Sequence, residues 1–154
     1  MGYWKLVEPI WDTVSIYDGP ETFLRQYNAS PDASRVLFAA HWTQSEVLNG
    51  GFDQYFFNST GVLAPEAASA FRQIGMPQTA AAVERAMSFF GIEYPRDRDE
   101  RQEAIDTAHG AAGDEDVDPF HEAADSVFDR IGEENGGFEA AADAYAASAT
   151  DLEQ

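Results

Sequence analysis

The sequence predicts an all-α fold, a single-domain bundle of about eight or nine short helices. Three observations lead to this prediction. Proline and glycine residues divide the chain into stretches of helical length, and apolar residues recur every three or four positions within them. No stretch shows the sustained apolar/polar alternation of a half-buried strand. With 154 residues, 44% of them hydrophobic, the whole chain (1–154) is expected to form one core.

Prolines set the expected starts of several helices. Pro31, Pro77 and Pro119 stand where a first helical residue belongs, because the N–H that proline lacks has no helical partner there. Ser30 and Asp118 come directly before two of these prolines and are expected to cap the helices. The helices are expected at roughly 3–16, 20–28, 31–49, 52–59, 65–74, 77–90, 97–109, 119–134 and 137–149.

Glycines and apolar spacing support these boundaries. Gly61, Gly75 and Gly91 stand where helices are expected to end. Asp97, with Glu100 three residues later, resembles a capping box in which Asp takes the capping role. The i, i+3, i+4, i+7 pattern predicts two buried stripes: Val83, Ala86, Met87 and Phe90, and Ala124, Val127, Phe128 and Ile131.

The segment at residues 110–118 is acidic and rich in small residues. It is expected to be a mobile loop inside the one domain, because neither side of it ends a self-sufficient core. The tail after residue 150 is expected to fray. The loop could attract Ca²⁺ weakly, but it lacks the glycine and the terminal glutamate of an EF-hand, so no metal site is expected.

The most distinctive run lies at residues 46–61. It predicts a helix that ends at Asn49, a sharp reversal at Gly50-Gly51 and a short aromatic helix. Three amide side chains, those of Asn49, Gln54 and Asn58, are expected to satisfy backbone groups at the helix ends. A phosphate site is disfavoured, since the lysine of a P-loop is missing. The residues to which we assign a structural role are Trp42, Glu46, Asn49, Gly50, Gly51, Phe52, Gln54, Tyr55, Phe56 and Asn58.

This run, E-V-L-N-G-G-F-D-Q-Y-F-F-N-S-T-G after Trp42, resembles the signature of the DMP19-like family. The resemblance covers roughly residues 36–105. It implies an all-α fold and, for the activity after which the family is named, DNA mimicry, in which a protein occupies the DNA-binding surface of a transcription regulator or nucleoid protein. The resemblance implies no catalytic residues.

Charge is distributed unevenly along the chain. Nine basic residues against 28 acidic residues give a formal net charge of −19, which argues against direct binding to nucleic acid or to an anionic membrane. Residues 1–92 hold nine acids and five bases, whereas residues 93–154 hold nineteen acids and four bases. A salt-adapted or merely solubilising surface would be acidic all round, so the gradient favours one dominant acidic face or end.

Helical spacing predicts three acidic stripes that could bind a partner. On the helix expected near residue 119, five carboxylates fall within about an 80° arc and form a ridge of about 22 Å. The candidate partner-binding residues are Asp99, Glu103 and Asp106; Asp118, Glu122, Asp125, Asp129 and Glu133; and Glu139 and Asp143. Like charges at i, i+4 cost a helix a few tenths of a kcal/mol each, which favours a functional reason. Plain acidic solvation remains the competing interpretation.

The sequence thus predicts a non-catalytic acidic protein that binds the basic surface of a DNA-binding protein. The alternative is a toxin-neutralising or adaptor protein that binds through an apolar patch ringed by acids. We expect no cofactor and a cytoplasmic location, because no signal or membrane-spanning run is evident. Tyr3, Trp4 and Trp11 could form a homodimer seam or could cover the core.

Histidines offer no clear catalytic or metal site. His41 lies beside a predicted apolar stripe and is expected to be a hydrogen-bonded core residue; the stripe is Val36, Leu37, Ala40, Val47 and Leu48. His121 begins an H-E-x-x-D sequence that lacks the second histidine of a zinc motif. An enzyme with an unrecognised pair of carboxylates is the remaining, disfavoured reading.

Overall fold

The computed structural model describes residues 2–112 and 120–152, with the backbone alone described for 111, 112, 121–126 and 150–152. The described residues form eight α-helices, three short 3₁₀ helices and no strand, which confirms the all-α prediction. The α-helices are α1 (Trp4–Trp11), α2 (Pro20–Asn28), α3 (Asp32–Phe57), α4 (Ala64–Gln73), α5 (Pro77–Met87), α6 (Arg98–Ala112), α7 (His121–Glu133) and α8 (Phe138–Leu152). The 3₁₀ helices are η1 (Ser59–Leu63), η2 (Ser88–Phe90) and η3 (Glu134–Gly136).

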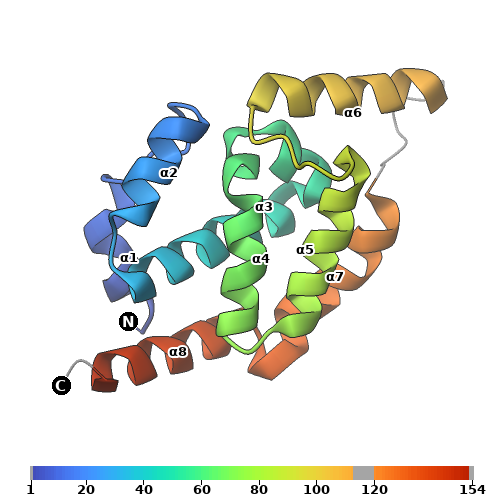
Figure 1. Ribbon diagram of the computed structural model, residues 1–154. Coiled ribbons are helices and arrows are strands. Elements are labelled where there is room, and N and C mark those ends of the chain that lie inside the picture. The colour runs from blue at the N-terminus through green and yellow to red at the C-terminus, as the bar shows by residue number, and fades with distance from the viewer. Residues whose placement is uncertain (1, 113–119, 153–154) are drawn as a thin grey trace.

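Helix α3 is the centre of the arrangement and contacts α1, α4, α6, α7 and α8. Helices α4 and α5 form an antiparallel pair, and α7 packs against α5 (Figure 1). Helix α6 crosses one end of the molecule and α8 crosses the opposite end, with α4, α5 and α7 between them (Figure 1). Two of the helices rich in acids, α6 and α8, are therefore placed at opposite ends (Figure 1).

The N-terminal helix is shorter than predicted. The expected helix at 3–16 ends at Trp11, because the chain beyond it is held by another element. The side chain of Gln26 in α2 accepts a hydrogen bond from the backbone N–H of Ser15 at 2.8 Å, so this group is not available to a helix. The low helix propensity of the residues after Trp11 acts in the same direction.

Two predicted boundary features need correction. Ser30 does not cap α3: its hydroxyl donates to the backbone carbonyl of Gln26 at 3.0 Å, and α3 starts without a side-chain cap. Helix α6 continues through Ala112, so the first residues of the predicted loop at 110–118 are helical, because alanine extends a helix readily. Asp118 and the rest of that loop lie outside the described residues. The Asp97 cap is confirmed by a 3.1 Å bond from the N–H of Glu100.

Two apolar residues leave the stripes predicted for them. Val127 and Ile131 are buried as expected, but Phe128 is 43% exposed. Val47 is buried, whereas Leu48 is 49% exposed. Each exposed residue directly follows a buried one, and one residue turns a helix by about 100°, which carries the second side chain to the flank. The stripe from Val83 to Phe90 is confirmed, with its last two members partly buried.

Candidate functional site

The Gly50-Gly51 run forms a kink inside one helix. The predicted helices at 31–49 and 52–59 are continuous in α3 except at Gly51, whose φ of 74° and ψ of −177° lie in a region open almost only to glycine. The predicted sharp turn of the chain at these glycines is confirmed, because side chains twelve residues apart meet across it: Thr43 bonds to Tyr55 at 2.9 Å and Asn58 to Glu46 at 3.4 Å. The first helical segment runs one residue further than predicted, to Gly50. Beyond the kink, Phe52, Tyr55 and Phe56 are all fully buried, as predicted.

A carboxylate closes the kink. Glu46 accepts a hydrogen bond from Gln54 at 2.6 Å and a longer one from Asn58 at 3.4 Å. Gln54 and Asn58 therefore bind a side chain across the bend, and the prediction that they satisfy backbone groups is wrong. A Cβ on Gly50 would lie 2.1 Å from the Gln54 side chain, which explains the first glycine. The positions of Glu46, Gly50, Gln54 and Asn58 in this run are therefore explained by the fold.

Arg101 of α6 is a residue that the sequence did not single out. Among the described residues it is the largest fully buried side chain, and its guanidinium donates to the backbone carbonyls of Phe56 at 2.8 Å and Asn58 at 2.9 Å. It also donates to the carbonyls of Pro95 and Arg96. Burial lowers the pKa of Arg101 from its ordinary value. The arginine thus caps the C-terminal end of α3, where helical carbonyls lack partners.

Gly61 makes room for this arginine. A Cβ on Gly61 would lie 2.5 Å from the Arg101 Nε atom. Gly61 lies inside η1, so the prediction that it ends a helix is wrong, whereas Gly75 and Gly91 follow helices with φ of 83° and 101°. A clue was present in the sequence, since three of the four bases in the acidic part of the chain lie at residues 96–101.

The bases of this cluster are bound to the protein itself, while the neighbouring acids are exposed. Arg96 forms a bidentate pair with Glu66, at 2.7 and 2.9 Å, and Arg98 donates to the carbonyl of Phe57. The exposed acids on the same helix are the three candidate residues Asp99, Glu103 and Asp106 together with Glu100, against one exposed base, Arg98. Helix α6 therefore presents net negative charge outward.

The other candidate acids lie on α7 and α8. Asp129, Glu133 and Glu139 are exposed, whereas Asp143 is half-buried and accepts a hydrogen bond from the backbone N–H of Tyr3 at 2.8 Å. Asp118 lies outside the described residues, as do the side chains of Glu122 and Asp125. In the described part of the chain, arginine ion pairs involve Asp32, Glu66 and Glu84, and none of the candidate acids.

The three predicted stripes do not form one face. Helix α6 lies at one end of the molecule, while α8 lies at the other end (Figure 1), and the chain enters α8 from the last residue of α7, Glu133, through η3. Helices α7 and α8 contact each other, and Glu133 and Glu139 stand on either side of the turn between them. The structure thus has two acidic ends: the α6 end (Asp99, Glu103 and Asp106) and the α7–α8 end (Asp129, Glu133, Glu139 and Asp143).

One acid between α7 and α8 has a structural role. Glu134 accepts hydrogen bonds from the backbone N–H groups of Gln78 and Thr79, both at 2.7 Å, and from the Thr79 hydroxyl at 2.8 Å. It thereby caps the N-terminus of α5 from a distant part of the chain. The next residue, Asn135, donates to the carbonyl of Ile74 at 3.0 Å. Together they hold the turn between α4 and α5.

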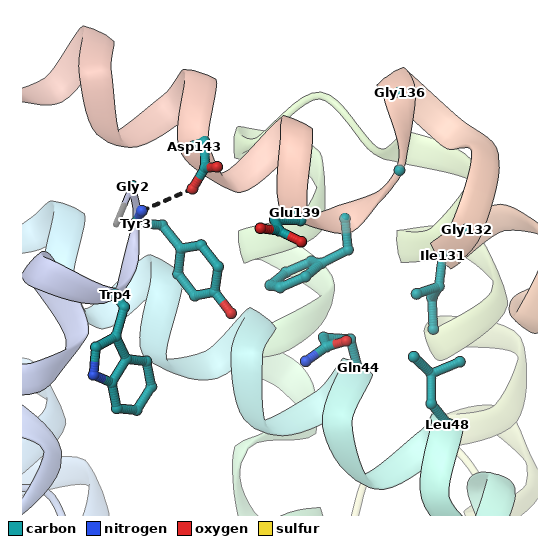
Figure 2. A pocket seen from close by; sticks show the side chains of 12 residues that line it. Gly2, Tyr3, Trp4, Gln44, Leu48, Ile131, Gly132, Gly136, Glu139 and Asp143 are labelled. Carbon is teal, nitrogen blue, oxygen red and sulfur yellow. Dashed lines mark hydrogen bonds between the residues drawn. The ribbon is translucent and has the colours of Figure 1, made fainter.

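A cavity of about 650 Å³ lies at the α7–α8 end (Figure 2). Its walls come from the N-terminal segment, from α3 just before the kink and from the turn between α7 and α8. Figure 2 shows Glu139 and Gln44 on opposite sides of the space, with Leu48 facing Ile131 at one end. The carboxylate of Asp143 holds the backbone of Tyr3 at the other end.

The wall at Tyr3 continues into an aromatic cluster. The Tyr3 hydroxyl bonds to Nδ1 of His41 at 2.9 Å, and the rings of Trp4 and Trp11 lie against the same imidazole. Burial lowers the pKa of His41, and the prediction of a hydrogen-bonded histidine is confirmed. Trp11 stacks on Trp42 at 4.9 Å. Because these rings pack on the core, the aromatic residues do cover it; a dimer seam stays a prediction.

The described residues offer neither a metal site nor a membrane-spanning helix. No group of three or more His, Asp or Glu side chains in them is placed to hold a metal ion. Among their helices, none combines the length and the apolar character needed to cross a membrane.

The sequence profile of the family described as DMP19-like protein matches residues 28–151. The chain belongs to the DMP19-like family. No curated protein and no solved structure matches the chain. The DMP19-like match includes the kinked α3, Arg101 and both acidic ends, and it leaves out α1 and the cavity wall at Tyr3 and Trp4.

Proposed function

We propose that this chain is a non-catalytic acidic protein that occupies the DNA-binding surface of a basic protein, such as a transcription regulator or a nucleoid protein. Its carboxylates would take the place of DNA phosphates. Membership in the DMP19-like family supports the proposal, because the activity after which the family is named is DNA mimicry. A partner of this kind would be displaced from DNA without any chemical step.

The proposal rests on the different placement of basic and acidic side chains near the start of α6. Within a few residues, Arg96 and Arg101 are drawn into contacts with a carboxylate and with carbonyls of the protein, while the acids at 99, 103 and 106 remain exposed. A surface built only for solubility has no need to separate the two signs, since interspersed charges serve solubility equally well. The separation leaves three carboxylates available to a basic partner.

The spacing of these acids favours a few strong contacts. Along α6 they are about 6 Å and about 4.5 Å apart, at a rise of about 1.5 Å per residue. Phosphates of one DNA strand are spaced by about 3.4 Å along the axis. The α6 stripe is therefore sparser than a DNA strand. Binding should depend on arginine and lysine pairs and should weaken as salt screens them.

A charge-matched pair of variants tests this role. The α6 variant carries Asp99→Asn, Glu103→Gln and Asp106→Asn. The control carries Glu8→Gln, Asp12→Asn and Glu21→Gln, which removes three exposed acids from α1, α2 and the segment between them. Both lose the same charge, so bulk electrostatics alone would weaken both equally. Binding to a panel of basic DNA-binding proteins from the same cell should weaken about tenfold or more for the α6 variant only, at about 1 kcal/mol or less for each exposed pair.

A second candidate, a toxin-neutralising or adaptor protein, is favoured by the cavity, where the half-exposed Leu48 lies near acids. The two functions respond differently to DNA. A partner bound through its DNA-binding surface should be released by duplex DNA, since both compete for the same groups. A toxin held by an apolar patch should remain bound when duplex is added.

A further inference from the structure

The two acidic ends differ in the hollows beside them. The cavity at the α7–α8 end is lined by Glu139 and Asp143, and none of the described residues that line it is Lys or Arg. The hollow beside α6 is smaller, about 160 Å³, and its lining combines three arginines, Arg96, Arg98 and Arg101, with two acids, Asp97 and Asp99. The first hollow therefore offers a cation carboxylates without a competing base, whereas the second does not.

The walls of the larger cavity combine aromatic rings with carboxylates. Tyr3 and Phe138 meet edge to face at 5.4 Å, and Trp4 extends the same wall. Glu139 is exposed and faces the space, so its charge is available to a ligand (Figure 2). Asp143 uses one oxygen to hold Tyr3, and so positions the aromatic wall. Burial raises the pKa of Tyr3, and Glu139 and Asp143 raise it further, which agrees with both charges acting at this wall.

Aromatic faces next to a carboxylate suit an organic cation. The ring quadrupole attracts positive charge, and the carboxylate adds an ion pair. A guanidinium fits better than an ammonium, because it is planar, weakly hydrated and able to stack on a ring. The volume lies within the range of about 300–1,000 Å³ that is usual for ligand pockets.

We propose that this cavity receives an arginine side chain of the protein partner, with Glu139 pairing the guanidinium and the rings of Tyr3 and Phe138 packing against it. This inference rests on the proposed function, because it names the part of a basic partner that docks at the α7–α8 end. Charge complementarity selects this occupant: a basic DNA-binding surface carries exposed arginines, and the cavity supplies the missing negative and aromatic partners. The wall at Tyr3 and Trp4 lies outside the family match, so the pocket would give this chain its own partner preference.

The test is a titration of the ¹⁵N-labelled full chain with the peptide acetyl-Gly-Arg-Gly-amide, followed by NMR. The matched probe is the same peptide with citrulline, which keeps the shape and removes the charge. The arginine peptide should shift the Trp4 indole signal and the backbone amides of Gly132, Gly136 and Gly137 in a saturable way. The citrulline peptide should leave them unchanged.

Two variants assign the effect to the cavity. Glu139→Gln should weaken binding of the arginine peptide about two- to fivefold, as expected for one exposed ion pair. Glu133→Gln removes an exposed acid of α7 that does not line the cavity, and should leave the affinity unchanged. Equal binding of the citrulline peptide, shifts spread over α6, or no effect of Glu139→Gln would overturn the cavity assignment.

These outcomes are separate from the proposed function. The peptide titration contains no DNA-binding protein, so its failure would remove the arginine pocket and leave the α6 experiment standing. Conversely, a pocket that binds the arginine peptide in a chain that binds no basic DNA-binding protein would keep the pocket and remove the mimic.

Discussion

The α6 end and the α7–α8 end carry the same kind of charge but are built differently. At the α6 end, Arg101 is buried against backbone carbonyls and the acids have no role in the fold that the structure shows. At the α7–α8 end, Glu134 caps another helix and Asp143 fixes the N-terminal segment. The same residue type thus supplies surface charge in one place and hydrogen-bond acceptors in the other. Counting acids along the chain does not distinguish the two uses.

The largest expected effect is at the buried base of the α6 end. Arg101→Met should lower the free energy of unfolding by about 3–5 kcal/mol, because several buried carbonyls lose their donor. Arg98→Met, at an exposed neighbour with one hydrogen bond to Phe57, should cost about 1 kcal/mol at most. Urea unfolding followed by circular dichroism measures both. Equal costs would mean that the buried guanidinium does not hold α6 to α3.

A smaller effect distinguishes two adjacent acids, Glu133 at the end of α7 and Glu134 in η3. Glu134→Ala should destabilise the protein by about 1–2 kcal/mol, because it removes the cap of α5. Glu133→Ala should change stability by less than about 0.5 kcal/mol, since this side chain is exposed. The same unfolding measurement applies. If the order were reversed, the division between structural and surface acids at this end would be wrong.

The smallest effect is a pH dependence at the α7–α8 end. Burial lowers the pKa of His41 in the folded protein, whereas the unfolded value is about 6.5. Below about pH 6.5 the unfolded state therefore binds a proton that the folded state does not bind. The stability that this histidine contributes above about pH 6.5 should be lost as the pH falls. One proton contributes at most about 1.4 kcal/mol per pH unit. His41→Gln should remove this contribution. The free energy of unfolding should then differ less between pH 7.5 and pH 5.5 in the variant than in the unchanged chain. An equal difference in both proteins would contradict this role of His41.

The sequence predicted the fold class and most helix positions because they depend on local signals. Pro77 and the glycines after residues 74 and 90 mark breaks that hold in any tertiary context. The acidic character of α6, α7 and α8 was also readable from i, i+4 spacing. Local rules failed where a distant partner decides the outcome. Gln54 reaches Glu46 across a bend, and Gln26 takes the N–H of Ser15, and neither pairing has a local signature.

The candidate site was harder to predict than the fold. Helical spacing places acids on one side of a helix, but it does not say where that helix lies in the bundle. The separation of α6 from α8, the structural use of Asp143 and the cavity beside Glu139 all arise from tertiary packing. Phe128 and Leu48 show the same limit, since each is exposed on the flank of a helix whose buried stripe was predicted correctly.

The central claim is that the acids of α6 stand in for phosphates, and a displacement assay tests it most directly. A fluorescent DNA duplex is bound to a basic protein that binds this chain, and the release of duplex is followed by anisotropy as the chain is added. The account predicts that the chain and its control variant at Glu8, Asp12 and Glu21 release the duplex, and that the variant at Asp99, Glu103 and Asp106 does not. Release that is equal for both variants would contradict it.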